Sequence, residues 1–160
     1  IAASATAIYQ GDPVEMLATG TIGVAAAGDV LLGSLNGVFF TDASTSKPTF
    51  ANHLKGSNTA TDIIGFVSDD PYERFEVQSN NTGASAQTDI GNVANIEYTA
   101  GSAPNYVSKV ELDDSDLATT DGQLKVIGVS KDPDNNDLTA ANVNWVVTIN
   151  EHFLKQTAGI

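Results

Sequence analysis

Apolar side chains recur in short stretches along the chain, often at alternate positions. Near the C-terminus, Trp145, Val147 and Ile149 are spaced by two, and further upstream Phe75 and Val77 flank Glu76. A period of two places such side chains on one face of a β-strand. On this basis the sequence predicts strands at residues 30–40, 63–67, 74–78, 95–98, 109–112, 124–129 and 144–150.

Turn-forming residues separate these stretches, and no stretch predicts a helix of three turns. Clusters of Gly, Pro, Asp and Asn lie at residues 11–13, 28–29, 69–71, 80–83, 121–122 and 132–136. Short helical pieces fit only at 71–74 or 139–143. Many short strands at fairly even spacing are typical of an all-β fold, a compact β-barrel or β-sandwich of short antiparallel strands with little helix.

The length and composition favour one globular domain. A chain of 160 residues is large enough to fold around one core, and 41% hydrophobic against 17% charged residues argues against a disordered polyelectrolyte. We expect a single β domain over residues 1–160, with 1–8 as an extended N-terminal arm or, alternatively, as the first strands of the fold. Residues 41–61 are expected to form a polar, exposed loop.

Charge and cysteine content exclude several classes of function. There is no Cys, so disulfides and Cys-ligated metals are excluded. The net charge of −13 repels nucleic acid and anionic membranes, and no apolar run approaches the ~20 residues that span a bilayer. The charge is uneven: residues 1–60 carry four acidic and two basic side chains, net −2, whereas residues 61–160 carry sixteen and five, net −11.

No motif of an enzyme accompanies the two histidines. His53 falls in the polar loop and His152 follows the last predicted strand, and neither belongs to a nucleophile elbow or a metal-ligand spacing. We therefore expect both to be surface or turn histidines, and we expect no catalytic residue and no cofactor.

Two acidic clusters resemble metal sites only in part. Asp132, Asp134 and Asn136 match the opening of an EF-hand loop. Asp137 stands where that loop needs Gly, and Val143 stands where it needs a bidentate Glu. Solvated acidic turns are therefore expected here and at residues 113–116, with no metal bound.

The glycines and aromatic residues predict structure rather than chemistry. Gly28, Gly33 and Gly37 do not match a phosphate-binding loop, and a hairpin with tight turns explains them. Trp145, on an alternating strand, is expected in the core. The tyrosines are scattered along the sequence, so no platform for stacking nucleic-acid bases is predicted.

A further signal lies in the order and spacing of nine stretches, residues 25–33, 40–43, 47–50, 62–71, 75–79, 86–91, 124–128, 131–135 and 147–152. By these stretches the chain resembles a group of tailed-bacteriophage virion proteins that accompany the major capsid protein as head decoration or cement proteins. Residues 29–38 are also similar to a Gly-Asp-x-Val-Leu-x-Gly-Ser-Leu-x-Gly-Val pattern of smaller decoration proteins. The group supplies no catalytic residues.

The resemblance implies a non-enzymatic virion protein that binds the outer surface of the capsid shell and stabilises it. Its partner would be the major capsid protein, and contact with further copies of itself at capsid symmetry axes is an open alternative. The protein would be made in the host cytoplasm. The nearly neutral N-terminal third is expected to supply the capsid contact, through Ile1, Ile8, Tyr9, Met16, Leu17 and Ile22.

A different virion role is the alternative. The chain would then be a head-fibre base, a tail component or an adhesion module that binds host carbohydrate. Such a sugar site would use Tyr72, Tyr98 and Tyr106 together with the Asn-rich turns.

Overall fold

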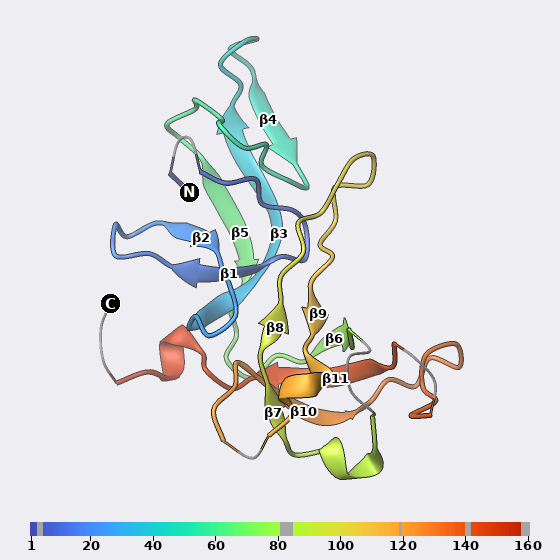
Figure 1. Cartoon of the computed structure of the whole chain (residues 1–160). Coiled ribbons are helices and arrows are strands. Elements are labelled where there is room, and N and C mark those ends of the chain that lie inside the picture. The colour runs from blue at the N-terminus through green and yellow to red at the C-terminus, as the bar shows by residue number, and fades with distance from the viewer. Residues whose placement is uncertain (3–4, 81–84, 119, 140–141, 158–160) are drawn as a thin grey trace.

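A computed structural model describes residues 1–2, 5–80, 85–118, 120–139 and 142–157. The all-β prediction is confirmed: these residues form antiparallel sheets of short strands, with three short 3-10 helices and no α-helix (Figure 1). The sheets do not close into a barrel.

The first sheet is built around the long strand β3. Because β3 spans eleven residues, it pairs with β1 near its start and with β4 near its end, while β5 pairs along its other side. Strand β2 continues the sheet beyond β1. The strands are β1 (Pro13–Met16), β2 (Ile22–Val24), β3 (Leu31–Thr41), β4 (Pro48–Ala51) and β5 (Ile64–Ser68).

The second half of the chain forms a four-stranded sheet and a two-stranded one. The four strands lie in the order β6-β11-β10-β7, and β8 pairs with β9. The strands are β6 (Phe75–Gln78), β7 (Val93–Ala94), β8 (Ile96–Glu97), β9 (Glu111–Leu112), β10 (Leu124–Val129) and β11 (Asn144–Ile149). The 3-10 helices are η1 (Gln87–Asp89), η2 (Asp114–Asp116) and η3 (Phe153–Lys155).

Each of the seven predicted stretches contains a strand, but four strands were not predicted. Strands β1, β2 and β7 have at most four residues, and β4 lies inside the segment 41–61 that the sequence predicts as an exposed loop. That prediction is wrong, because the segment also buries Leu54 and Ala60. Residues 71–74 form a turn rather than a helix, and the other helical piece, 139–143, lies partly outside the described residues.

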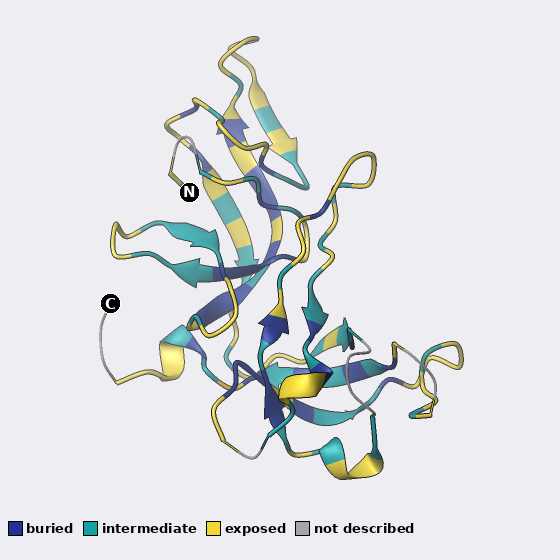
Figure 2. Cartoon of the chain, viewed as in Figure 1, coloured by how far each residue is buried: buried dark blue, intermediate teal, exposed yellow. Residues whose placement is uncertain are grey.

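The buried side chains form two clusters instead of the one core that the length suggests. Ile8, Leu35 and Leu54 lie in the cluster under the first sheet. Trp145 and Val147 lie in the cluster of the second half, so the prediction that Trp145 is a core residue is confirmed. Figure 2 shows buried residues along β1 and β3 of the first sheet and along β8 and β11 of the second half.

Residues 28–37 do not form the predicted hairpin, because β3 runs straight through them from Leu31. Gly28 alone lies in a turn, with φ of 87°. Gly33 is needed where the backbones approach closely, since a Cβ there would overlap the carbonyl oxygen of Ser68 on β5. Gly37 lies under the ring of Phe50, whose Cζ is 3.0 Å from the position that a Cβ on residue 37 would take.

The segment between β8 and β9 joins the two halves of the molecule. Gln10 and Val107 form an isolated parallel bridge, and the Ser108 amide donates to the Gln10 carbonyl at 2.7 Å. The Asn52 side chain donates to the carbonyls of Asn105 and Tyr106 at 3.3 and 3.4 Å. Because Gln10 and Asn52 flank the first core, these bonds fix the second half against it.

Candidate interaction surface

The most prominent surface feature is a group of large apolar side chains on the outer face of the first sheet. Phe50 is 67% exposed, Ile64 55%, Phe66 46% and Phe39 37%. Alternation along β3 explains this exposure, since Val38 and Phe40 point into the core and Phe39 therefore points outward. We call these four residues the aromatic face.

Strand register makes the aromatic face continuous. Phe39 lies opposite Phe50 on β4 and opposite Ile64 on β5, and Phe66 lies opposite Gly37. Directly opposite residues share a sheet face, so all four side chains lie together on three neighbouring strands. The rings of Phe50 and Phe66 are 5.6 Å apart between centroids, above the gap that Gly37 leaves.

The aromatic face carries few charges at its edge. Asp62 lies beside it and accepts hydrogen bonds from the amide and the hydroxyl of Thr41, and these bonds lower the pKa of its carboxyl. An ionised Asp62 therefore holds the end of β3 in place. Contiguous exposed apolar patches on folded proteins are candidates for interaction surfaces.

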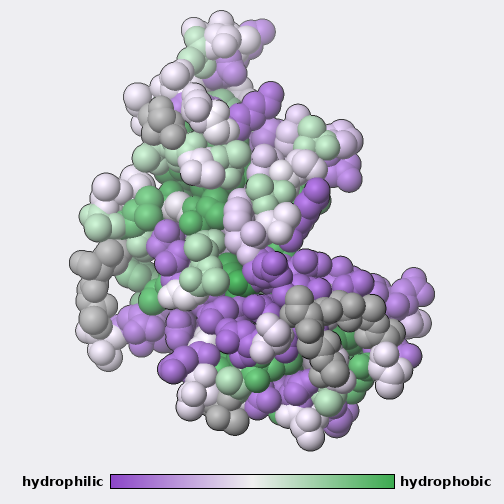
Figure 3. All heavy atoms as spheres, in the orientation of Figure 1, coloured by the Kyte–Doolittle hydropathy of each residue, from purple (hydrophilic) through white to green (hydrophobic). Residues whose placement is uncertain are grey.

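The structure brings four of the predicted contact residues together beside strand β5. Ile8, Leu17 and Ile22 line a cavity of about 450 Å³, and Ile22 and Ile1 both approach Gly65. Figure 3 shows hydrophobic residues gathered in this region, over β1, β2 and β5, whereas the lower half of this view is mostly hydrophilic. Met16 is half-buried against the same core.

Ile8 does not belong to the surface that the sequence assigns to it. Its side chain is completely buried, and its amide and carbonyl both bond to Leu54. The amine of Ile1 donates to the Ile63 carbonyl at 3.0 Å. The described part of segment 1–8 therefore lies on the chain's own first sheet, which favours the alternative to an extended arm.

Tyr9, the remaining predicted contact residue, lies in an aromatic stack that the sequence did not predict. Its ring is 6.3 Å from that of His53 and 6.4 Å from that of Tyr106, and His53 and Tyr106 stack directly at 3.9 Å with an angle of 4° between them. All three are half-buried. Because the rings pack on one another, they hold the segment between β8 and β9 on the first sheet.

His152 contradicts the expectation of two surface or turn histidines, because its side chain is completely buried. Its Nδ1 accepts a hydrogen bond from the Leu154 amide at 3.1 Å. Burial, together with Lys155, lowers the pKa of His152 against the opposing effect of Asp69 and Asp70. His53 is half-buried, and burial with the nearby Lys55 lowers its pKa too.

The tyrosines of the alternative sugar site have different surroundings. Tyr72 is 80% exposed, with the ammonium of Lys155 5.1 Å from its ring centroid. The hydroxyl of Tyr98 is buried, and burial together with Asp12 and Tyr9 raises the pKa of Tyr98 to about 12. Tyr106 is packed on His53.

The acidic clusters form local turns. Asp132 accepts a hydrogen bond from the amide of Asp134, and Asp113 accepts from the amide and hydroxyl of Ser115. Within the described residues, no three His, Cys, Asp or Glu side chains are grouped so that they could hold a metal ion. The same residues contain no helix that is long and apolar enough to cross a membrane.

No protein-family model, curated protein or solved structure matches this chain.

The sequence did not single out the aromatic face because its residues come from three separate segments. Phe50 lies in the segment predicted as a loop, and exposed Phe39 lies between the buried residues Val38 and Phe40, so these three apolar residues show no alternation. Phe66 and Ile64 were placed in a predicted strand without a prediction of which face they occupy. The one available signal was Phe50 itself, a large aromatic residue within an otherwise polar segment.

Proposed function

We propose that this chain is a structural protein of a tailed-phage virion, which binds the outer surface of the capsid shell and stabilises it. The aromatic face is the observation that carries the proposal. It offers the shell a rigid, apolar contact surface on a sheet that is packed on its other side. This assignment replaces the six residues proposed from sequence as the main contact.

The distribution of charge supports this orientation. The aromatic face lies within residues 39–66, where Asp42 and Asp62 balance Lys47 and Lys55, whereas residues 67–160 carry fifteen acidic and five basic side chains, net −10. The cores of protein interfaces are depleted in charge, because buried charges lose their hydration. The acidic half would then face solvent and keep the coated particle soluble.

The energetics of a repeated contact fit a stabilising role. Burying a Phe side chain contributes about 1.5–3 kcal/mol, so a face with three Phe and one Ile supplies several kcal/mol for each bound copy. A protein that binds only the assembled shell stabilises it by mass action. Occupying many equivalent positions multiplies this effect over the particle.

The proposal is tested by measuring binding to capsids prepared without the chain. Phe50→Ser with Phe66→Ser should weaken binding by at least about tenfold, because roughly 1.5–3 kcal/mol is lost for each fully buried ring. Phe50 is 67% and Phe66 46% exposed in the free chain, so its melting temperature should fall far less than its capsid affinity.

The matched control is Tyr72→Ser with Leu154→Ser, which removes two exposed apolar side chains outside the aromatic face. This variant should bind capsids like the wild type. If the two double variants bind equally well, the aromatic face is not the contact surface and the proposed orientation fails.

A further inference from the structure

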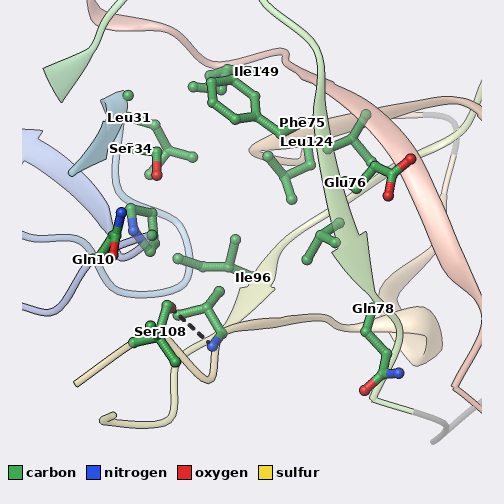
Figure 4. A pocket seen from close by; sticks show the side chains of 17 residues that line it. Gln10, Leu31, Ser34, Phe75, Glu76, Gln78, Ile96, Ser108, Leu124 and Ile149 are labelled. Atoms are coloured by element: carbon green, nitrogen blue, oxygen red, sulfur yellow. Dashed lines mark hydrogen bonds between the residues drawn. The ribbon is translucent and has the colours of Figure 1, made fainter. Parts of the chain in front are cut away.

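A pocket of about 380 Å³ lies between the two halves of the molecule and follows the length of strand β6. All four β6 residues line it, from Phe75 to Gln78. Apolar side chains, Ile96 and Ile149 among them, contribute to its wall, and Gln10 and Ser108 lie beside Ile96, across the pocket from Glu76 and Gln78 (Figure 4). A volume of this size holds roughly three residues of extended chain, and it lies within the ~300–1,000 Å³ range of ligand pockets.

Strand β6 has a free edge along this pocket. It ends the sheet order β6-β11-β10-β7, so within the described residues only one side of it is paired with a strand. Beyond β6, the Ser79 amide donates to Val143 in the β11 direction, whereas the Asn80 amide donates to Leu112 on the opposite side.

The alternation of bonding direction identifies the groups on that free edge. In an antiparallel ladder, successive residues direct their amide and carbonyl alternately to one side and the other. Because Ser79 points to β11, so do Val77 and Phe75, and the amides and carbonyls of Glu76 and Gln78 point away from β11. The parallel bridge between Ser79 and Leu112 directs the Leu112 amide to the Gln78 carbonyl, so the template for one more strand consists of the amide and carbonyl of Glu76 and the amide of Gln78.

The side chains of β6 define what such a strand must carry. Phe75 and Val77 share the face of β6 that packs against the second core cluster, whereas Glu76 is exposed and is directed away from Leu31 and Ser34 in Figure 4. Glu76 is the one charged residue among the pocket's lining residues, and the Ser130 hydroxyl donates to its carboxylate at 3.0 Å. A residue directly opposite Glu76 on an added strand would share its face.

We infer that the edge of β6 is a binding site for an extended peptide segment of a partner protein, added as an antiparallel strand. The segment carries a basic residue opposite Glu76 and apolar residues on either side, which enter the pocket. Main-chain hydrogen bonds supply affinity, and the alternating side chains supply specificity. The site shares no residue with the aromatic face, so the inference goes beyond the proposed function and does not depend on it.

The test uses the whole chain and a synthetic probe, the acetylated and amidated pentapeptide Thr-Val-Lys-Val-Thr. Titration followed by NMR should give saturable binding, with amide shifts concentrated at Glu76 and Gln78. Methylating the backbone nitrogen of the peptide's Lys removes the amide that donates to Glu76. This should weaken binding about two- to tenfold, since one lost hydrogen bond is worth roughly 0.5–1.5 kcal/mol.

A charge exchange provides the matched control. Glu76→Lys lies at an exposed edge position, so the fold should be retained. It should bind the lysine peptide about two- to fivefold more weakly and bind a peptide with Glu in place of Lys more tightly by a similar factor, as expected for an exposed ion pair. Absence of saturable binding at millimolar peptide, or equal binding of the methylated and unmethylated peptides, would overturn the inference.

Discussion

Asp12 lies at the junction between the first sheet and the segment that links β8 to β9. Its side chain is completely buried, and its Oδ2 accepts a hydrogen bond from the Tyr9 amide at 2.8 Å. Burial raises the pKa of this carboxyl, while Ser108 and the Tyr9 amide lower it in part. A buried carboxyl at this position makes the junction sensitive to pH.

Asp12→Asn should remove this sensitivity. Because the pKa of Asp12 is higher in the folded chain, the folded state holds more protons than the unfolded state between the two pKa values. The free energy of unfolding therefore falls as pH rises from the ordinary pKa of Asp to the higher pKa of Asp12 in the folded chain. Above that pKa the destabilisation by the ionised Asp12 is complete. Asn keeps an acceptor for the Tyr9 amide and does not titrate.

Urea denaturation of both proteins at a series of pH values measures this difference. The stability of Asp12→Asn relative to wild type should increase as pH rises through that window and should then level off. Two stability curves that stay parallel across the window would show that the Asp12 carboxyl does not titrate differently in the folded state.

At the scale of elements, the segment between β8 and β9 connects the two cores. It reaches the first sheet through the Tyr106–His53 stack, through the Asn52 hydrogen bonds and through the Gln10 bridge to Val107. These contacts connect residues that are distant in sequence. None of them belongs to a ladder between named strands, so side chains supply much of the connection.

A double-mutant cycle on His53→Ala and Tyr106→Ala should reveal this coupling. Stacked aromatic pairs contribute about 0.5–1.5 kcal/mol beyond the area that they bury. The stability lost in the double variant should therefore be smaller, by this amount, than the sum of the losses in the two single variants. A second cycle that pairs His53→Ala with Tyr72→Ala should be additive. If the first cycle is additive too, the His53–Tyr106 stack does not stabilise the contact between the β8–β9 segment and the first sheet.

The sequence predicted the strands with clear alternation and failed where the signal was short or divided. Strand β11 was predicted nearly to its observed bounds, because Trp145, Val147 and Ile149 alternate and are buried. Strand β4 was missed, since four residues with one Phe give no period and depend on pairing with β3 for their conformation. Without strand β4 the aromatic face could not be predicted either, because only the pairing of strands in the folded chain brings Phe50 beside Phe66.

For the whole molecule, two cores share one long strand and a common boundary. Leu31 belongs to the second cluster and Leu32 to the first, so β3 links them directly. The N-terminal segment contributes to the first cluster through Ile8. The first sheet therefore has one face packed on a core and the opposite face bearing the aromatic residues.

Deleting residues 1–8 should destabilise the chain substantially. The deletion removes the fully buried Ile8 and both of its backbone hydrogen bonds to Leu54, and truncating a buried Ile alone costs about 2–5 kcal/mol. Thermal unfolding should show a clearly lower melting temperature, with a smaller effect when only residues 1–2 are removed. An unchanged melting temperature after the longer deletion would restore the extended-arm interpretation.

The most direct test of the proposed function is an electron cryomicroscopy reconstruction of capsids to which the chain has been added. Density for the chain is expected on the outer surface of the shell, with the acidic half facing solvent and with four side chains buried against capsid subunits: Phe39, Phe50, Ile64 and Phe66. A chain absent from the shell, or bound with these four side chains exposed to solvent, would contradict the proposed function.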